Sequence, residues 1–322
     1  MPAIPFTEAA PAEATADDRH VLVVGEALVD VVHRADGSVD EHPGGSLANV
    51  ALTLGRLGRD ARLATWLGQD ERGAAIRAWL DESAVTLTPG STDADRTSVA
   101  TARLDAHGAA TYQFDLEWRV PAGTAPGTGT LAVHTGSIAA VLEPGASDVR
   151  ALVAAARDTA TVTYDPNARP PLMGDPADAR TRIEALVALA DVVKVSDEDL
   201  AWLAPGTDPV SLAHQWLTLG PALVVITYGG EGALAITATG EQRVTAPRVD
   251  VVDTVGAGDS FMGALLDGLW GAGLLGADRR DALHAIDGAV LGGVLRRCVA
   301  VAAVTVSRAG ANPPRRSELA SA

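Results

Sequence analysis

The chain has 322 residues, 47% of them hydrophobic, which is enough to bury one large core and does not require two independent domains. Its formal net charge of −16 repels phosphate backbones and anionic lipid headgroups, so we expect neither nucleic acid nor a membrane as a partner. An anionic ligand must then be held by local devices, such as a helix N-terminus, a metal ion or a few placed cations.

The chain begins with a segment that we predict to be a disordered leader, residues 1–19. This segment is rich in Ala, Pro and acidic residues, and it has neither the basic start nor the apolar run of a signal peptide. The single cysteine, Cys298, cannot form an internal disulfide, which indicates a reducing compartment. We therefore expect a cytoplasmic protein.

Short Val- and Leu-rich runs alternate with amphipathic segments, a pattern that predicts a parallel sheet covered by helices, that is, an α/β fold. The clearest strands are expected at residues 20–25, 131–134, 161–165, 191–195 and 222–228. Helices are expected at residues 46–58, with Ser46 as N-cap, and at 72–82, 148–157, 181–190 and 257–270.

Two segments, residues 29–43 and 96–118, interrupt this rhythm because apolar and polar residues alternate in them. They carry turn signals at residues 35–37 and 105–108. They predict two β-ribbons in a small antiparallel sheet that stands off the main body and covers a site as a lid. The alternative is a plain extension of the main sheet. We favour the lid because the ribbons flank a Gly-rich segment.

That Gly-rich segment, PGGSLAN at residues 43–49, joins the first ribbon to the following helix. Gly44 and Gly45 remove side-chain bulk where a polyhydroxylated ligand could touch the backbone, and Asn49 offers both a donor and an acceptor. Asp30 adds a carboxylate that can accept two hydroxyl hydrogen bonds. Together these residues predict a sugar pocket, although the glycines alone are also typical of a plain turn.

Three further polar runs follow predicted strands, where ligands of α/β folds bind. YDPNARP at residues 164–170 offers Arg169, whose guanidinium can bind an oxyanion bidentately or simply face solvent. KVSDED at residues 194–199 has the pattern of a helix start, with Ser196 as N-cap and acidic residues in the first turn. TYGGEG at residues 227–232 is a turn.

The strongest signal is DTVGAGD at residues 253–259, which opens an apolar helix. The free N–H groups of Gly256, Ala257 and Gly258 would face a ligand at the helix N-terminus, where the helix dipole favours negative charge. Asp259 beside these amides is placed to take a proton from an attacking hydroxyl. A Gly-rich turn capped by Asp would give the same local pattern.

Two apolar runs complete the chain. Residues 249–252 are expected to form a strand before the Gly-rich turn. Residues 282–306 are interrupted by Asp287, Arg296 and Arg297, which would be costly in a bilayer. We predict buried helix and strand there.

The PGGSLAN and DTVGAGD runs resemble, in order and separation, the two signatures of the ribokinase-like carbohydrate kinases, also called the PfkB family. The similarity spans roughly residues 21–313. It implies a doubly wound, mainly parallel sheet with a small β lid: a kinase domain at 20–313 that contains both ribbons, and a C-terminal tail at 314–322. It also implies a sugar bound by Asp30, Gly44, Gly45 and Asn49, and catalysis by Asp259 with Gly256, Ala257, Gly258 and Arg169.

The same resemblance implies ATP as the phosphoryl donor, bordered by Lys194, Ser196, Thr227, Gly229, Gly232 and Gly258. The family usually has an Asn and a Glu three apart where this chain has Ser196 and Asp199. Mg²⁺ would therefore be held, through water, by Asp199 or Glu198. Asp253 and the loop at residues 307–311 would hold a monovalent cation such as K⁺.

The run at residues 164–170 resembles the corresponding segment of fructokinases and 2-keto-3-deoxygluconate kinases. The expected reaction is phosphorylation of a sugar primary hydroxyl, with D-fructose giving fructose 6-phosphate. One alternative is a 2-keto-3-deoxygluconate kinase, for which Arg103 and Arg119 would supply an additional cation. The other is a non-catalytic sugar-binding regulator. Exposed ribbon faces often pair, so the pattern also allows a homodimer through the lid.

Overall fold

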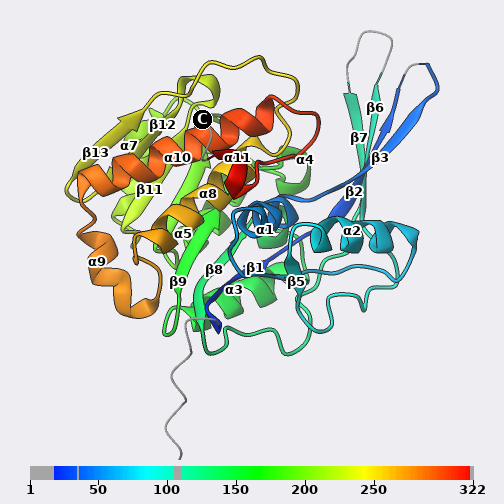
Figure 1. Cartoon of the computed structure of the whole chain (residues 1–322), viewed down its shortest axis with the longest axis horizontal. Coiled ribbons are helices and arrows are strands. Elements are labelled where there is room, and N and C mark those ends of the chain that lie inside the picture. Colours follow the sequence, from blue (N-terminus) through cyan, green and yellow to red (C-terminus); the bar gives the residue numbers. More distant parts are fainter. Residues whose placement is uncertain (1–17, 35, 105–109, 320–322) are drawn as a thin grey trace, which may run out of the picture.

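The computed structural model describes residues 18–34, 36–104 and 110–319 (Figure 1). The predicted leader at residues 1–19 therefore lies almost entirely outside the described residues. The same holds for the predicted turn at 105–108, for residue 35 and for residues 320–322.

A large, mostly parallel sheet forms the centre of the molecule, with its strands in the order β13-β12-β11-β10-β9-β8-β1-β4-β5. The strands are β1 (His20–Val24), β4 (Ala61–Ala64), β5 (Val85–Leu87), β8 (Thr130–Gly136), β9 (Thr161–Asp165), β10 (Val192–Ser196), β11 (Leu223–Thr227), β12 (Ala233–Thr237) and β13 (Gly240–Val244). Central strands such as β1 are completely buried and rich in valine, as expected where helices cover both faces. The predicted α/β fold is confirmed.

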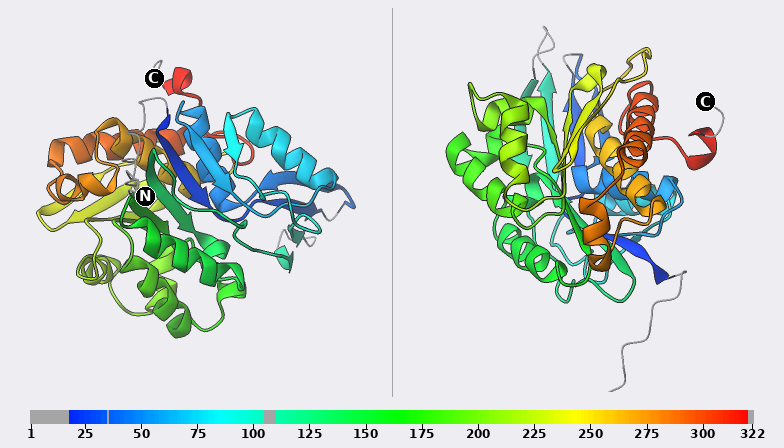
Figure 2. Two further views of the ribbon diagram at one scale, coloured as in Figure 1. Left: turned by 90° about the horizontal axis from the view of Figure 1, so that it is seen from below. Right: turned by 90° about the vertical axis from the view of Figure 1, so that its left-hand side faces the viewer.

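Helices lie on both faces of this sheet (Figure 2). On one face, α1 (Ser46–Arg56), α8 (Ala257–Gly271) and α10 (Gly288–Val306) pack together; on the other lie α3 (Gly145–Ala156), α6 (Asp197–Leu203) and α7 (Pro209–Leu217). The remaining helices are α2 (Glu71–Asp81), α4 (Pro170–Met173), α5 (Pro176–Val187), α9 (Arg280–His284) and α11 (Arg316–Leu319), with short 3-10 turns η2 (Ser137–Ala140), η3 (Gly229–Glu231) and η4 (Ala277–Arg279).

Helix α10 corrects the prediction that divided residues 282–306 between helix and strand. The side chain of Asp287 accepts from the Ala289 and Val290 amides and caps the helix. Valine favours strands, but packing along α8 and β13 overrides that preference. By length and composition α10 could cross a membrane, yet half of its most apolar window is buried against this core. It therefore packs as the core helix of a globular fold does.

The strand predicted at residues 249–252 is also wrong. These residues lie outside the sheet, and Val251 and Val252 are 62% and 63% exposed. The Val252 amide donates to the Val306 carbonyl at 2.8 Å. The segment is thus tied to the end of α10 instead of to a neighbouring strand.

The two predicted ribbons form one sheet in the order β3-β2-β6-β7, which stands out from the main body (Figure 1). Its strands are β2 (Leu28–His33), β3 (Val39–Gly44), β6 (Val99–Leu104) and β7 (Ala110–Asp115). The sheet is mixed and not antiparallel as predicted, because β2 and β6 pair in parallel. Both strands run in the same direction, and each is paired with an antiparallel strand that returns the chain.

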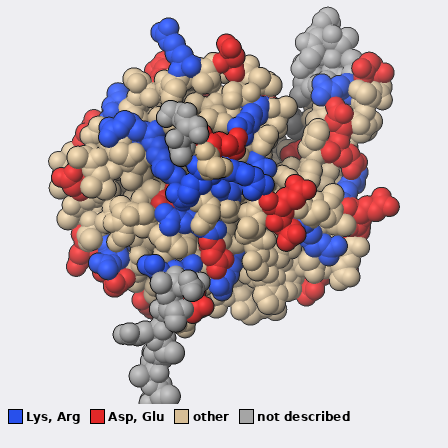
Figure 3. Space-filling view, in the orientation of Figure 1, with Lys and Arg blue, Asp and Glu red and all other residues tan. Residues whose placement is uncertain are grey.

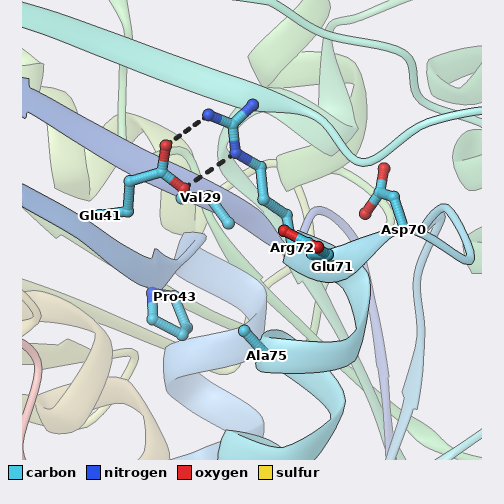
Figure 4. A pocket seen from close by; sticks show the side chains of 7 residues that line it. All are labelled: Val29, Glu41, Pro43, Asp70, Glu71, Arg72 and Ala75. Atoms are coloured by element: carbon cyan, nitrogen blue, oxygen red, sulfur yellow. Dashed lines mark hydrogen bonds and ion pairs between the residues drawn. The ribbon is translucent and has the colours of Figure 1, made fainter.

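Alternation along the strands gives this small sheet two different faces. On the outer face, toward α2, a cavity of about 540 Å³ is lined by Val29, Glu41, Pro43, Asp70, Glu71, Arg72 and Ala75 (Figure 4). Glu41 of β3 accepts from Arg72 of α2 at 2.5 and 3.0 Å, and this ion pair attaches the small sheet to the body. The inner face carries Leu28 and Asp30.

An arginine cluster attaches the C-terminal segment, residues 307–319, to α1 and α8. At its centre is Asp267, whose side chain is 2% exposed and contacts Arg59 at 2.6 Å, Arg297 at 2.9 Å and Arg316 at 2.6 Å. Figure 3 shows basic side chains gathered over this part of an otherwise acidic molecule. One buried carboxylate thus joins α8, α10 and α11 with the loop after α1.

Candidate active site

A cavity of about 480 Å³ lies between the inner face of the small sheet and the N-termini of α1 and α8. Its lining consists of Glu26, Leu28, Asp30, Gly45, Ser46, Asn49, Ala100, Phe114, Ile138, Asn167, Arg169, Pro170, Pro171 and residues 254–259. Asp30, Asn49 and Asp259, predicted from segments far apart in the chain, therefore line one space. A single small molecule can touch all three.

Asp259 lies in the first turn of α8, is 6% exposed, and is held by three side-chain donors. Its Oδ1 accepts from the Ser46 hydroxyl at 2.7 Å and from the Asn167 amide at 3.2 Å, and its Oδ2 accepts from the Asn49 amide at 2.7 Å. These contacts fix the rotation of the carboxylate before any ligand arrives. Ser46 was predicted as an N-cap, but Gly45 occupies that position and the Ser46 hydroxyl serves Asp259 instead.

The two predicted glycines are required by close packing around the cavity. A Cβ on Gly44 would lie 2.2 Å from Oδ2 of Asp30, and a Cβ on Gly45, whose φ is 105°, would lie 2.6 Å from the Glu26 carbonyl oxygen. Burial raises the pKa of Asp30 to about 6, and Arg169 opposes that rise. Oδ1 of Asn49 is buried without a partner among the described residues. A ligand hydroxyl would satisfy it.

The loop after β9 brings Asn167 and Arg169 to the cavity. Asn167 has φ 37°, in the left-handed region that Asn tolerates better than most residues. One guanidinium nitrogen of Arg169, Nη1, donates to Oδ1 of Asn167 at 2.6 Å and to the Ala168 carbonyl at 3.0 Å. Nη1 is thus occupied, and only the other nitrogens of Arg169 are left for an oxyanion contact, which stays a prediction.

The Gly-rich turn before α8 has Gly256 as N-cap, with φ 75°. The prediction of three free amides needs correction, because the Ala257 amide donates to the Thr254 carbonyl at 3.3 Å. In the described part of the chain the Gly256 and Gly258 amides have no acceptor. A Cβ on Gly258 would lie 2.9 Å from Nζ of Lys194, so an ammonium stands beside the turn. We call residues 256–258 the anion turn.

Residues 307–311, the closing loop, press against the anion turn. A Cβ on Gly256 would lie 2.6 Å from the Ala311 Cβ. Both carboxylate oxygens of Asp253 accept backbone amides, from Val255 at 3.0 Å and from Gly310 at 2.9 Å. Asp253 thus joins the loop to the turn, which is a structural task; its monovalent cation role stays a prediction.

Lys194 of β10 and Asp165 of β9 form a buried ion pair, with 2.8 Å between Nζ and Oδ2 and side chains 3% and 2% exposed. Burial acts to lower the pKa of Lys194, but Asp165 and Asp199 together raise it above its ordinary value. The ammonium therefore stays charged and supplies a local cation for an anionic ligand in an acidic protein.

The two candidate magnesium residues are placed differently. Asp199 is half-buried and accepts from the Ala168 amide at 3.1 Å, whereas Glu198 is exposed. Ser196 caps α6 as predicted, accepting from the Asp199 amide at 3.0 Å. The described residues contain no group of three or more His, Cys, Asp or Glu that could hold a metal by itself. Magnesium is commonly held by one or two carboxylates with substrate phosphates and water, and Asp199 fits that requirement.

The remaining predicted nucleotide residues lie at the ends of β10 and β11, outside the 480 Å³ cavity. Thr227 pairs in register with Ser196. Gly229 has φ 49° and open space around it, whereas a Cβ on Gly232 would lie 2.0 Å from the Val244 carbonyl oxygen. Gly232 is thus required by the turn itself.

Sequence reasoning gave no site role to Ser46, Asn167 or Glu26, although all three line the cavity. Ser46 and Asn167 stand inside runs that were singled out, but their contacts with Asp259 depend on separations of 213 and 92 residues. Glu26 follows β1, and the rule that ligands bind at the carboxyl ends of strands could have indicated it.

Comparison with known proteins agrees with this geometry. Residues 18–318 match the family described as pfkB family carbohydrate kinase. A fructokinase from Rhizobium leguminosarum bv. trifolii is 36% identical over 262 residues, which cover 77% of this chain and 79% of that protein.

Two solved structures share the whole fold. The crystal structure of a fructokinase with bound ATP from Xylella fastidiosa has a TM-score of 0.80 at 26% identity, covering 94% of this chain and 98% of that one. An aminoimidazole riboside kinase from Salmonella enterica, complexed with aminoimidazole riboside and an ATP analog, has a TM-score of 0.76 at 28% identity, covering 94% and 99%.

Proposed function

Because the chain belongs to the pfkB family of carbohydrate kinases, and is thus a phosphotransferase with a sugar acceptor, we propose that it transfers the γ-phosphoryl group of ATP to D-fructose, giving fructose 6-phosphate. The observation that carries the proposal is the single cavity in which Asp259 lies with Asp30 and Asn49. Fructokinases among the relatives support the choice of sugar.

In this proposal Asp259 accepts the proton of the sugar hydroxyl while that oxygen attacks the γ-phosphorus and ADP leaves. Ser46, Asn49 and Asn167 hold the carboxylate in position. The Gly256 and Gly258 amides, at the N-terminus of α8, stabilise the negative charge that spreads over the transferred group.

Lys194 and Arg169 add positive charge beside the anion turn and the cavity. Asp199 would hold Mg²⁺ through water, and the ion would neutralise phosphate charge. The small sheet covers the acceptor side of the cavity and excludes water, which limits wasteful hydrolysis of ATP.

The charges in the cavity favour a neutral sugar over a sugar acid. Three carboxyl groups line it, those of Glu26, Asp30 and Asp259, against one guanidinium among the described lining residues, that of Arg169. Arg119, a candidate cation for 2-keto-3-deoxygluconate, pairs with Glu117 on the surface at 3.4 Å, and Arg103 is likewise absent from the lining. A substrate carboxylate would meet net repulsion here.

A panel assay tests the proposal. ATP consumption is measured with fructose, 2-keto-3-deoxygluconate, ribose and aminoimidazole riboside, with and without Mg²⁺. Fructose should give the highest kcat/KM. If the protein binds fructose but none of the sugars in the panel supports ATP consumption, it is a sugar-binding regulator and the kinase proposal is wrong.

Asp259→Asn tests the base. It should lower kcat by about 10²–10⁴-fold, while fructose binding, measured by isothermal titration calorimetry, changes little because Asn keeps the shape of the site. Turnover close to that of the wild type would contradict the assignment.

Location and assembly are further parts of the proposal. The buried Cys298 and the acidic surface are consistent with the cytoplasm. Val39 of β3 is half exposed at the edge of the small sheet, where a second copy could pair. Light scattering of the wild type and a Val39→Lys variant would test a dimer through this edge.

A further inference from the structure

Glu26 is a buried carboxyl in the sugar cavity to which no role has been given so far. It lies two residues beyond the end of β1, is 5% exposed, and lines the cavity together with Asp30 and Arg169. Burying a carboxyl away from water is costly. Its presence therefore calls for a reason.

One oxygen of Glu26 has a structural task. Oε2 accepts from the Ala139 amide in η2 at 3.2 Å. Capping this amide needs only one neutral acceptor, and a glutamine would supply it. The Ser137 hydroxyl of the same turn also acts on this carboxyl and lowers its pKa. A neutral acceptor would suffice for both donors, so the negative charge goes beyond what the 3-10 turn requires.

The surroundings of this carboxyl move its ionisation close to neutral pH. Burial raises the pKa of Glu26 to about 7, and Arg169 opposes the rise. The other charged groups of the cavity are Asp30 from β2, which itself faces His42 of β3, and Asp259 from α8. A hydroxyl hydrogen bond to an ionised carboxylate is stronger than one to a neutral group.

We propose that Glu26 is a second sugar-recognition carboxyl. Together with Asp30 it accepts hydrogen bonds from hydroxyls of the sugar, and Glu26 is ionised when the sugar is bound. The inference rests on the sugar kinase function proposed above. The substrate must then be a polyol that presents one hydroxyl to Asp30 in β2 and another to Glu26 after β1. The ionisation of Glu26 also makes sugar affinity, but not ATP affinity, increase as pH rises through 7.

The test compares wild type, Glu26→Gln and Glu82→Gln at pH 6, 7 and 8. Glu82→Gln is the matched control, because it makes the same chemical change at an exposed side chain that belongs neither to the small sheet nor to the cavity lining. At pH 8, Glu26→Gln should raise the fructose KM about tenfold, the loss expected for one charge-assisted hydrogen bond. The ATP KM should stay within twofold.

The pH profile separates recognition from a structural role. The ratio of the fructose KM of Glu26→Gln to that of wild type should shrink toward pH 6. There the glutamate of the wild type is mostly protonated and as neutral as the glutamine of the variant. A ratio near one at pH 8, or a ratio that does not change with pH, would overturn the proposal. Equal rises in the fructose and ATP KM values would also overturn it, since they indicate general damage.

A measurement on the wild type keeps the proposal testable if Glu26→Gln does not fold. Fructose binding without ATP at pH 7 should release a fraction of a proton, because binding to the ionised form lowers the pKa of Glu26. Calorimetry in two buffers of different ionisation enthalpy measures this release. No release would refute the role of Glu26, whereas a wild type that phosphorylates no sugar would refute the proposed function itself.

Discussion

Replacing Asp267 by Asn would test whether the arginine cluster holds the C-terminal segment. The change keeps the shape of the side chain but leaves Arg59, Arg297 and Arg316 without their shared counter-charge. Removing one partner of a buried ion pair costs roughly 3–5 kcal/mol. The three arginines are between 21% and 47% exposed, so water recovers part of their solvation. We therefore expect a loss of about 3 kcal/mol.

The assay is urea unfolding followed by circular dichroism, with thermal melts beside it. With an unfolding entropy of about 2.1 cal/mol/K per residue, a loss of about 3 kcal/mol lowers Tm by about 4 °C. The ATP KM should also rise, because the closing loop belongs to the segment that the cluster anchors. Asp278→Asn is the control, since Asp278 is 79% exposed and its ion pair with Arg279 is long, at 3.5 Å. Such a surface pair contributes little to stability. A loss below about 1 kcal/mol, equal to that of the control, would refute the reasoning.

Three other outcomes are expected. The raised pKa values of Glu26 and Asp30 mean that these carboxyls ionise more readily in the unfolded state than in the folded one. The ligand-free protein should therefore become less stable as pH rises from about 5 to 8. For Glu26 the loss in the free energy of unfolding approaches about 3 kcal/mol, and urea titrations of wild type and Glu26→Gln would measure it. Gly256→Ala should raise the ATP KM at least tenfold in steady-state assays, because φ 75° and the closing loop leave no room for a methyl group; an unchanged KM would contradict this. Asp199→Ala should raise the Mg²⁺ concentration needed for half-maximal activity more than Glu198→Ala does, and the reverse order would move the metal to Glu198.

Much of the fold could be predicted because local pattern and tertiary structure agree there. β9, for example, was predicted with its observed bounds, since a buried strand flanked by polar runs has one simple interpretation. Prediction failed where long-range contacts decide. The valines at 251–252 have strand propensity but no neighbouring strand to pair with, and Ser46 has the residue type of an N-cap but is used by a carboxylate 213 residues away.

The candidate site divides in the same way. Asp30, Asn49 and Asp259 could be selected from motifs, and the cavity does contain all three. The motifs carry no information on what faces Asp259 from the loop after β9, or on which amide of the anion turn is already bonded. Those facts depend on side-chain packing between separate segments, which no local pattern encodes.

The way Asp259 is held has a consequence for biosynthesis. Its donors come from the start of α1 and from the middle of the chain, 213 and 92 residues earlier. A nascent polypeptide cannot complete this constellation until the ribosome has released most of the domain. Turnover therefore requires that these distant segments have packed against one another, which makes enzymatic activity a stricter reporter of complete folding than helix content.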